Sequence, residues 1–264
     1  MLLLFEGISI GQDYIMKLLI LCPAGFLAAM VDSIAGGGGL IAVPAYLMAG
    51  VPPHLTLGTN KFASTAASFT SSLKFARSGK VNADLLKYLA PLTLIGAALG
   101  VTSVLKVSQG FLSTLVLILI LCVGLYTVFS KTIGLEDNFK GLTKKNISLG
   151  IVLALLLGFY DGFFGPGAGS FLIFGLISIF GFDFVKASGN AKALNFVSNI
   201  TSMVLFAIHG QVNYKLAVPV AICMIFGARI GTVMALKKGA KLIKPIFIVM
   251  SLGVAIKMLY QMIF

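Results

Sequence analysis

The sequence predicts an all-α, polytopic membrane protein made of two homologous, inverted halves of about five membrane segments each. Three observations lead to this fold class: an apolar composition along the whole chain, an internal repeat, and a Gly-rich break before a short second segment in each half. The 264 residues are 58% hydrophobic and 11% charged, with a mean hydropathy of +1.04. Soluble domains are typically about 45–50% apolar, so the composition indicates a lipid environment.

Ten apolar segments are expected. In the first half (first membrane repeat, 1–131) they lie at about 15–35, 39–50, 57–76, 83–105 and 110–130; in the second (second membrane repeat, 147–264) at about 147–164, 168–181, 186–208, 212–236 and 243–262. A cytoplasmic linker, 132–146, separates the halves. Crossing a hydrocarbon core of ~30 Å takes about 20 helical residues. Segments 39–50 and 168–181 are shorter, so each either crosses with the help of its glycine run or is re-entrant.

The two halves can be aligned as a repeat. "GTNKFASTAASFTSSLKFARSGKVN", which starts at Gly58, aligns without gaps with "GNAKALNFVSNITSMVLFAIHGQVN", which starts at Gly189. Upstream, "DSIAGGGG" from Asp32 corresponds to "DGFFGPGAG" from Asp161. Five segments per half is an odd number, so the halves should be inserted upside down relative to each other, as in many secondary transporters.

Basic residues between the segments indicate the orientation. If every segment crosses, one side of the membrane holds only Lys17, Lys106, Lys215 and Lys257. The other side then holds Lys74, Arg77, Lys80, Lys87, Lys131, Lys140, Lys144, Lys145, Lys186, Lys237, Lys238, Lys241 and Lys244. Because cytoplasmic loops are enriched in Lys and Arg, this second side is expected to be cytoplasmic and both termini periplasmic. If the short segments dip in and return, the basic loops are expected to split between the two sides. Ten crossings are favoured because they place most basic residues on one side.

A polar stripe follows the third segment of each half. Lys61, Ser64, Ser68 and Ser71 recur at helical spacing on one face, and their repeat mates are Lys192, Asn195, Asn199 and Ser202. An ionised Lys at the bilayer centre costs about 2.5 kcal/mol or more, so such a face must look at protein or water. We therefore expect a central substrate-binding site with two ammonium groups, formed by Lys61, Ser64, Ser68, Lys192, Asn195 and Asn199. The alternative is that the small polar residues only pack helices together and the lysines snorkel to the surface.

Arg229 has no basic mate, because Ala98 occupies the equivalent position. It is flanked by Gly227 and Gly231, whose spacing is typical of a close helix contact. We expect its side chain to face a cavity or an aspartate. It is therefore included among the candidate anion-binding residues, and a structural pair with Asp32 or Asp161 is the alternative.

The glycine runs predict helix breaks at membrane depth. Glycine and proline are poor helix formers, and freed backbone inside a membrane survives only where it is buried in protein or lines a cavity. The short helix that restarts after each run presents the positive end of its dipole, which favours an anion. The residues of the two breaks are Gly36, Gly37, Gly38, Gly39, Gly165, Pro166, Gly167 and Gly169.

Each break follows an aspartate, Asp32 or Asp161, by four residues. One interpretation is that the carboxylate accepts hydrogen bonds from the loosened loop. The other is that one or both aspartates take up and release a proton and so couple transport to the proton gradient.

Several classes of function are not supported by the sequence. Cys22, Cys122 and Cys223 are isolated in apolar runs, and His54 and His209 fall in predicted outer loops, so no metal site is expected. The glycine runs lack the G-K-[ST] ending of a nucleotide-binding loop, no catalytic triad is apparent, and no cofactor is expected. The net charge of +12 is interpreted as a topology signal and not as a nucleic-acid surface. The expected partners are a small anionic solute and the lipid bilayer; homo-oligomerisation is left open.

Four motifs resemble the repeated motifs of the TauE/SafE family of membrane transporters, the sulfonate uptake permease group, and are most similar to its YfcA-like branch in the bacterial inner membrane. They are "DSIAGGGGLIAVPA", "TNKFASTAASF", "GFYDGFFGPGAGSF" and "AKALNFVSNI". The resemblance spans almost the whole chain. It implies a secondary transporter of sulfite, sulfonates or other sulfur-containing anions in the cell inner membrane, with export favoured, but it does not fix the solute. Alternating access is favoured, and a passive anion channel of the same architecture is the alternative.

Overall fold

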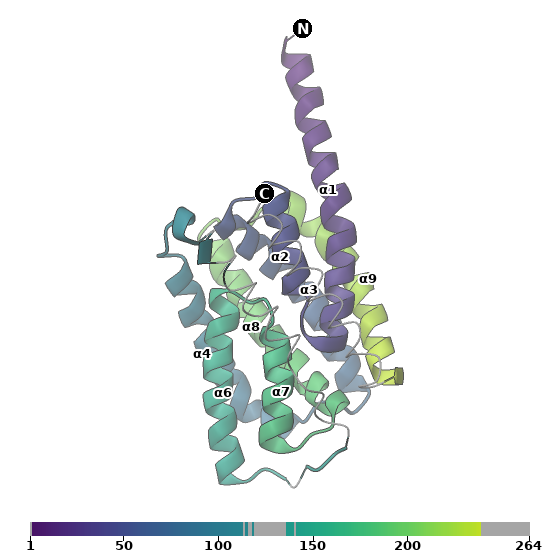
Figure 1. Cartoon of the computed structure of the whole chain (residues 1–264), viewed down its shortest axis with the longest axis vertical. Helices are drawn as coiled ribbons and strands as arrows, with labels where there is room; N and C mark the ends of the chain where they lie inside the picture. The colour runs from purple at the N-terminus through teal and green to yellow at the C-terminus, as the bar shows by residue number, and fades with distance from the viewer. Residues whose placement is uncertain (1, 113, 116–117, 119–135, 140, 239–264) are drawn as a thin grey trace.

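The computed structural model describes residues 2–112, 114–115, 118, 136–139 and 141–238, and the described helices form a single bundle (Figure 1). Within these residues there is no strand, and the prediction of an all-α, polytopic membrane protein is confirmed. The helices are α1 (Leu2–Ala35), α2 (Gly39–Met48), α3 (Pro53–Arg77), α4 (Ala83–Val104), α6 (Lys144–Phe163), α7 (Ala168–Phe180), α8 (Phe184–Ile208) and α9 (Tyr214–Lys238). Segment 243–262, and all but a few residues of segment 110–130, lie outside the described residues.

Five stretches within the described helices are long and apolar enough to cross a membrane. They are Asp13–Ala35, Ala83–Val104, Lys144–Phe163, Phe184–Ile208 and Tyr214–Lys237. Helix α3 is as long as α8, at 25 residues, and could span ~37 Å. It is less apolar because its buried face carries Lys61 and a row of serines and threonines.

Glycines bring two pairs of long helices into close contact: α1 packs along α9, and α4 packs along α6. A Cβ atom on Gly227 would lie 2.1 Å from the carbonyl oxygen of Phe26, and one on Gly100 would lie 2.2 Å from that of Phe159. Such backbone-to-backbone contact is typical of small residues at membrane helix interfaces. In the sequence repeat α1 corresponds to α6 and α9 to α4, so the two interfaces are equivalent under the repeat.

The short helices turn back along the helices that precede them. Gly38, just before α2, packs against Ala28 and Asp32, while Tyr46 near the end of α2 lies in one apolar cluster with Leu21. Helix α2 therefore runs antiparallel to α1.

Helix α7 returns along α6 in the same way. Gly175 packs against Leu153, and the ring of Phe180 packs against Gly150 near the start of α6. With 10 and 13 residues, α2 and α7 cover only ~15 and ~20 Å. The prediction of ten crossings is therefore wrong, because each short helix returns to the side of the bundle from which its preceding helix started.

The two ends of the bundle can be named by the helices that start there. The α1 side holds the end of α2, the start of α3, the end of α4 and the α8–α9 turn, and it is uppermost in Figure 1. The α6 side holds the α3–α4 turn, the end of α7 and the start of α8.

Basic residues concentrate on the α6 side. Among the described basic residues of the loops and helix ends, Lys17, Lys106 and Lys215 lie toward the α1 side. Those toward the α6 side are Lys74, Arg77, Lys80, Lys87, Lys144, Lys145, Lys186, Lys237 and Lys238. The expectation that re-entrant segments would split the basic loops is therefore wrong as well. The α1–α2 pair enters and leaves the bundle by one side, and so does the α6–α7 pair. The loops therefore lie on the same sides as they would if all four helices crossed. Lys131, Lys140, Lys241, Lys244 and Lys257 lie outside the described residues.

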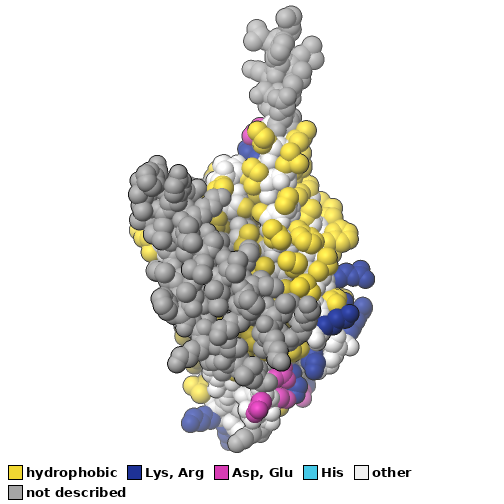
Figure 2. Space-filling view, turned by 45° about the vertical axis from the view of Figure 1, so that its right-hand side comes forward, with side chains coloured by type: hydrophobic (Ala, Val, Ile, Leu, Met, Phe, Trp, Pro, Cys, Tyr) yellow, Lys and Arg dark blue, Asp and Glu magenta, His cyan; other side chains and the backbone are white. Residues whose placement is uncertain are grey.

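The outer surface of α1 is strongly apolar. Figure 2 shows a broad hydrophobic face in its upper part, with Lys and Arg below it. Ile15, Met16 and Leu19 on α1 and Phe226 and Ile230 on α9 contribute exposed side chains of the kind that a lipid bilayer covers.

Candidate functional site

The two glycine breaks meet inside the bundle. A Cβ atom on Gly36 would lie 2.3 Å from the carbonyl carbon of Gly169, and one on Gly39 would lie 2.8 Å from the Cα of Pro166. Gly36 also has a φ of +83°, which L side chains rarely adopt. The contact is completed by the Ser170 hydroxyl, which donates to the Ala35 carbonyl across 2.8 Å. Only residues without side chains allow the two chain reversals to approach this closely.

Two buried ion pairs connect the halves at this point. Lys61 on α3 pairs with Asp161 on α6 at 2.8 Å, and Lys192 on α8 pairs with Asp32 on α1 at 2.7 Å. Each lysine comes from one repeat and its aspartate from the other, so the pairs are reciprocal. The lysine side chains are 4% and 0% exposed, which rules out snorkelling in this structure.

The two pairs differ in their surroundings. Lys61 also donates to the amide oxygen of Asn199 at 3.0 Å, and Ser198 donates to the second oxygen of Asp161. Asp32 accepts, besides Lys192, a longer bond of 3.3 Å from the Gly38 amide. The difference follows from the sequence, since Ala67 and Ser68 occupy the repeat positions of Ser198 and Asn199.

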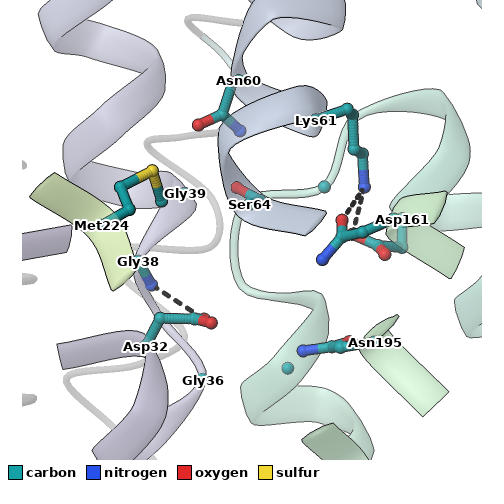
Figure 3. Close-up of a pocket in the computed structure, with 13 residues that line it drawn as sticks. Asp32, Gly36, Gly38, Gly39, Asn60, Lys61, Ser64, Asp161, Asn195 and Met224 are labelled. Carbon is teal, nitrogen blue, oxygen red and sulfur yellow. Dashed lines mark hydrogen bonds and ion pairs between the residues drawn. The ribbon is translucent and has the colours of Figure 1, made fainter. Parts of the chain in front are cut away.

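A small cavity of about 30 Å³ is lined by both aspartates and by Lys61, but not by Lys192 (Figure 3). That volume holds one or two water molecules and is too small for a larger solute. The buried amide oxygens of Asn60 and Asn195 have no hydrogen-bond partner among the described residues. The lining residues are Asp32, Gly36, Gly38, Gly39, Asn60, Lys61, Ser64, Asp161, Gly165, Gly169, Asn195, Asn199 and Met224.

On the α1 side, the α8–α9 turn closes against the start of α3. The Asn213 amide donates to the Thr59 hydroxyl at 3.0 Å. A Cβ atom on Gly58 would lie 1.9 Å from the carbonyl oxygen of Gln211. We call this set of four residues the α1-side clasp.

On the α6 side, the α3–α4 turn closes against the start of α8. The Asn82 amide donates to the side chain of Asn190 at 2.8 Å, and a Cβ atom on Gly189 would lie 2.3 Å from the carbonyl oxygen of Lys80. We call these four residues the α6-side clasp. All four are the repeat mates of the α1-side clasp, so the same contact is made once on each side of the cavity.

A larger cavity of about 260 Å³ lies beside the α6-side clasp. Its walls include Lys80, Lys186, Phe139 and Phe182 as well as both clasp asparagines. Lys186 pairs with Asp137, which lowers the pKa of that carboxyl group below its usual range. The cavity is therefore a basic vestibule next to the clasp.

The structure brings most of the predicted site residues together. Ser68 lies behind the cavity, where it receives a hydrogen bond from Asn199, and Gly37, Pro166 and Gly167 complete the breaks. The Gly38 amide donates to Asp32, which supports the interpretation that this carboxylate accepts from the loosened loop. Proton uptake by the aspartates stays a prediction. How these residues act on a solute stays a prediction.

The predicted placement of Arg229 is wrong. Its side chain is exposed on α9 and does not line the cavity. The alternative pairing with Asp32 or Asp161 is wrong as well, because both carboxylates pair with lysines. The Gly227 and Gly231 contact with α1 fixes the buried face of α9, and Arg229 falls outside that face.

The two histidines differ from each other. His54 was expected in a solvated loop, but it lies in the first turn of α3, 6% exposed, with its Nε2 3.0 Å from the Val104 carbonyl oxygen. His209 is exposed at the end of α8. The described part of the chain contains no group of three His, Cys, Asp or Glu residues that could hold a metal ion. Cys122 lies outside the described residues.

Sequence reasoning missed three residues of the site. Asn60 precedes Lys61 and Ser198 precedes Asn199, so each lies beside the polar stripe and could have been included as a helical neighbour. Met224 lines the cavity from α9 but sits in an apolar run that carries no signal.

An all-helical bundle with lipid-facing surfaces, helix breaks that meet in its interior and buried charges beside them defines a polytopic membrane transporter. The comparisons agree with this class. The chain matches the family described as "Sulfite exporter TauE/SafE" over residues 21–258, and it belongs to that family.

Curated relatives cover nearly the full chain. A "Probable membrane transporter protein" of Haemophilus influenzae is 38% identical over 253 residues, 96% of this chain and 97% of the relative. "Probable membrane transporter protein YfcA" of Escherichia coli K12 is 35% identical over 235 residues, 89% of this chain and 87% of the relative. No solved structure matches the chain.

Removing one member of a buried pair should destabilise the protein more than removing both. Lys61→Met leaves the Asp161 carboxylate uncompensated, a change that costs about 3–5 kcal/mol at buried sites. The double variant Lys61→Met/Asp161→Asn should recover most of that loss. Thermal unfolding in detergent measures both. A double variant as unstable as the single one would mean that the pairing does not explain the cost.

Proposed function

We propose that the protein is a secondary transporter of small anions. It works by alternating access, and an aspartate of its site takes up and releases a proton during transport. The observation that carries the proposal is the pair of reciprocal Lys–Asp bridges, buried where the two helix breaks meet. Intramembrane charges are costly and are kept where they serve a pathway or a bound ion.

The charges of the site favour an exchange between carboxylate and anion. With both aspartates ionised, each ammonium is neutralised by its carboxylate. No positive charge is then left unpaired at the site to attract an anion. Protonating one aspartate leaves a buried ammonium without its counter-charge, a state that costs several kcal/mol. A monoanion that takes the place of the carboxylate restores neutrality. Anion binding and proton binding should therefore favour each other.

The donors at the site suit an oxyanion. The ammonium groups of Lys61 and Lys192 and the side-chain amide of Asn195 can donate hydrogen bonds to oxygen atoms. Sulfite and organosulfonates present such oxygens, and the name of the family favours this class and its export. The cavity of about 30 Å³ is too small for sulfite or a sulfonate. Such an anion can enter only if the ion pairs or the helix breaks are displaced.

The matched clasps support alternating access. Each closes one side of the bundle over the central cavity, and the two are built from repeat-equivalent residues. An inverted repeat offers two equivalent packings, in which one clasp opens while the other stays closed. In that switch, the α1–α2 hairpin and the α6–α7 hairpin would each take up the packing that the other has in this structure.

The basic vestibule and the surrounding lysines favour a cytoplasmic α6 side. The α1 side, with the N-terminus, would be periplasmic, and the protein would reside in the bacterial inner membrane. An anion to be exported would first meet Lys80 and Lys186 and then the α6-side clasp.

Anion flux into liposomes that contain the purified protein tests the proposal. The panel is sulfite, an organosulfonate, thiosulfate and a carboxylate, each with and without a pH gradient. The double variants Lys61→Met/Asp161→Asn and Lys192→Met/Asp32→Asn should each reduce flux at least tenfold, since each lacks one ammonium but leaves no buried charge unpaired.

Lys215→Ala, which removes an exposed lysine at the start of α9, is the matched control and should keep full flux. Wild-type flux should saturate with solute concentration; conductance without saturation would instead indicate a passive channel. Absence of anion-dependent flux across the whole panel would refute the proposal.

Glycine substitutions in the clasps should bias access in opposite directions. A Cβ at Gly189 forces the α6-side clasp apart, and a Cβ at Gly58 forces the α1-side clasp apart. Overpacking of this kind costs about 1–3 kcal/mol, and 1.4 kcal/mol already shifts an equilibrium tenfold. With Ser64→Cys as a reporter in a cysteine-free background, Gly189→Ala should speed labelling by an impermeant thiol reagent from the α6 side, and Gly58→Ala from the α1 side.

Gly110→Ala is the control, because a Cβ there would have no atom of the described residues within 4 Å. Equal changes in labelling from both sides, in either clasp variant, would contradict a role of the clasps as alternating gates.

A further inference from the structure

We propose that Asp32, and not Asp161, is the carboxylate that takes up and releases the coupling proton. This inference rests on the proposed function and assigns its proton to one of two repeat-equivalent groups. Three differences between the two ion pairs lead to it.

The first difference is access to water. The side chain of Asp32 is 24% exposed, whereas that of Asp161 is 8% exposed. A proton must reach the carboxylate by way of water or another titratable group. Asp32 is the more accessible of the two, and it faces the cavity (Figure 3).

The second difference is the number of firm donors on each carboxylate. Asp161 accepts from Lys61 on one oxygen and from Ser198 on the other. When such a carboxylate takes up a proton, it must give up or weaken a bond from one of its two side-chain donors. Asp32 has Lys192 on one oxygen and only the 3.3 Å bond from Gly38 on the other. Protonation therefore disrupts less at Asp32.

The third difference is whether the lysine keeps a hydrogen-bond acceptor once its aspartate is protonated. If Asp161 were protonated, Lys61 would keep the amide oxygen of Asn199 as an acceptor at 3.0 Å. Within the described residues, Lys192 has Asp32 as its acceptor and is 0% exposed. Protonation of Asp32 thus leaves an ammonium that only an incoming anion can neutralise. Strong coupling between proton and anion follows at Lys192 and is weaker at Lys61.

The charged groups around Asp32 are few. Helix α1 packs against α2, α3, α7, α8 and α9. Lys192 on α8 faces Asp32 directly, and Lys61 on α3 and Asp161 on α6 line the same cavity. Helices α2 and α7 contain no Asp, Glu, Lys, Arg or His, and α9 contributes Met224 to the cavity. Among the residues that the structure describes, no other carboxylate lines this cavity to act in place of Asp32 or Asp161.

The hydrogen bond from Gly38 gives Asp32 a link to the conformation of the break. Gly38 precedes α2 and its Cβ position is occupied by the Asp32 side chain and the Ala28 carbonyl. A proton on Asp32 weakens the bond from the Gly38 amide, because a neutral carboxyl group is the poorer acceptor. The start of α2 can then move in step with the release of Lys192.

Proton movement driven by a sulfonate gradient tests the assignment. A sulfonate keeps its single charge across the accessible pH range, so any pH dependence belongs to the protein. In liposomes with an internal pH indicator, the wild type should move about one proton with each sulfonate. Asp161→Asn should keep that coupling even where its rate falls, and Asp32→Glu should keep it as well.

Asp32→Asn should lower the number of protons moved per sulfonate to a tenth of the wild-type value or less, whatever its transport rate. Asp13→Asn, which changes an exposed aspartate on the same helix, is the matched control and should behave as the wild type. Loss of coupling in Asp161→Asn, or full coupling in Asp32→Asn, would overturn the assignment. If Asp32→Asn does not fold, the Asp161→Asn result decides alone. Absence of wild-type sulfonate flux would be a failure of the proposed function, which this design separates from a failure of the assignment.

Discussion

The structure depends on the neutralisation of two buried ammonium groups by carboxylates from the opposite repeat. Lys61 and Lys192 are almost fully buried, and removing the carboxylate from a buried ion pair costs several kcal/mol. Each bridge ties a helix of one half to a helix of the other. The pairs therefore hold the two halves in register and at the same time place charged groups at the centre of the bundle.

The glycine breaks make this arrangement geometrically possible. Gly36 and Gly169 approach so closely that any side chain would separate the hairpins, and both aspartates lie one helical turn before their breaks. Because α2 and α7 return to the side they came from, the breaks lie inside the protein, where their backbone is buried. Charge, break and clasp thus recur twice around one cavity, an arrangement found in transporters built from inverted repeats.

Much of the fold and the site could be predicted from the sequence. The helical spacing of the polar residues indicates which helix faces are buried, and the internal repeat indicates that the same face recurs in both halves. The polar stripe with Lys61 and Lys192, the two aspartates and the glycine runs all converge on one place. The hairpin geometry could not be predicted, because a short apolar segment has the same composition whether it crosses or returns. Arg229 was misplaced for a related reason: spacing defines the face of a helix, but only packing decides which face is covered. The partners of the lysines join residues far apart in sequence, and nothing local encodes them.

The central claim is that an anion replaces an aspartate on a buried ammonium group. A structure determined with a sulfonate or sulfite bound, at a pH low enough to protonate one carboxylate, tests it most directly. The account predicts an anion oxygen within hydrogen-bond distance of Nζ of Lys192 or Lys61, with the paired aspartate withdrawn. An anion bound elsewhere while both Lys–Asp bridges remain intact would contradict it.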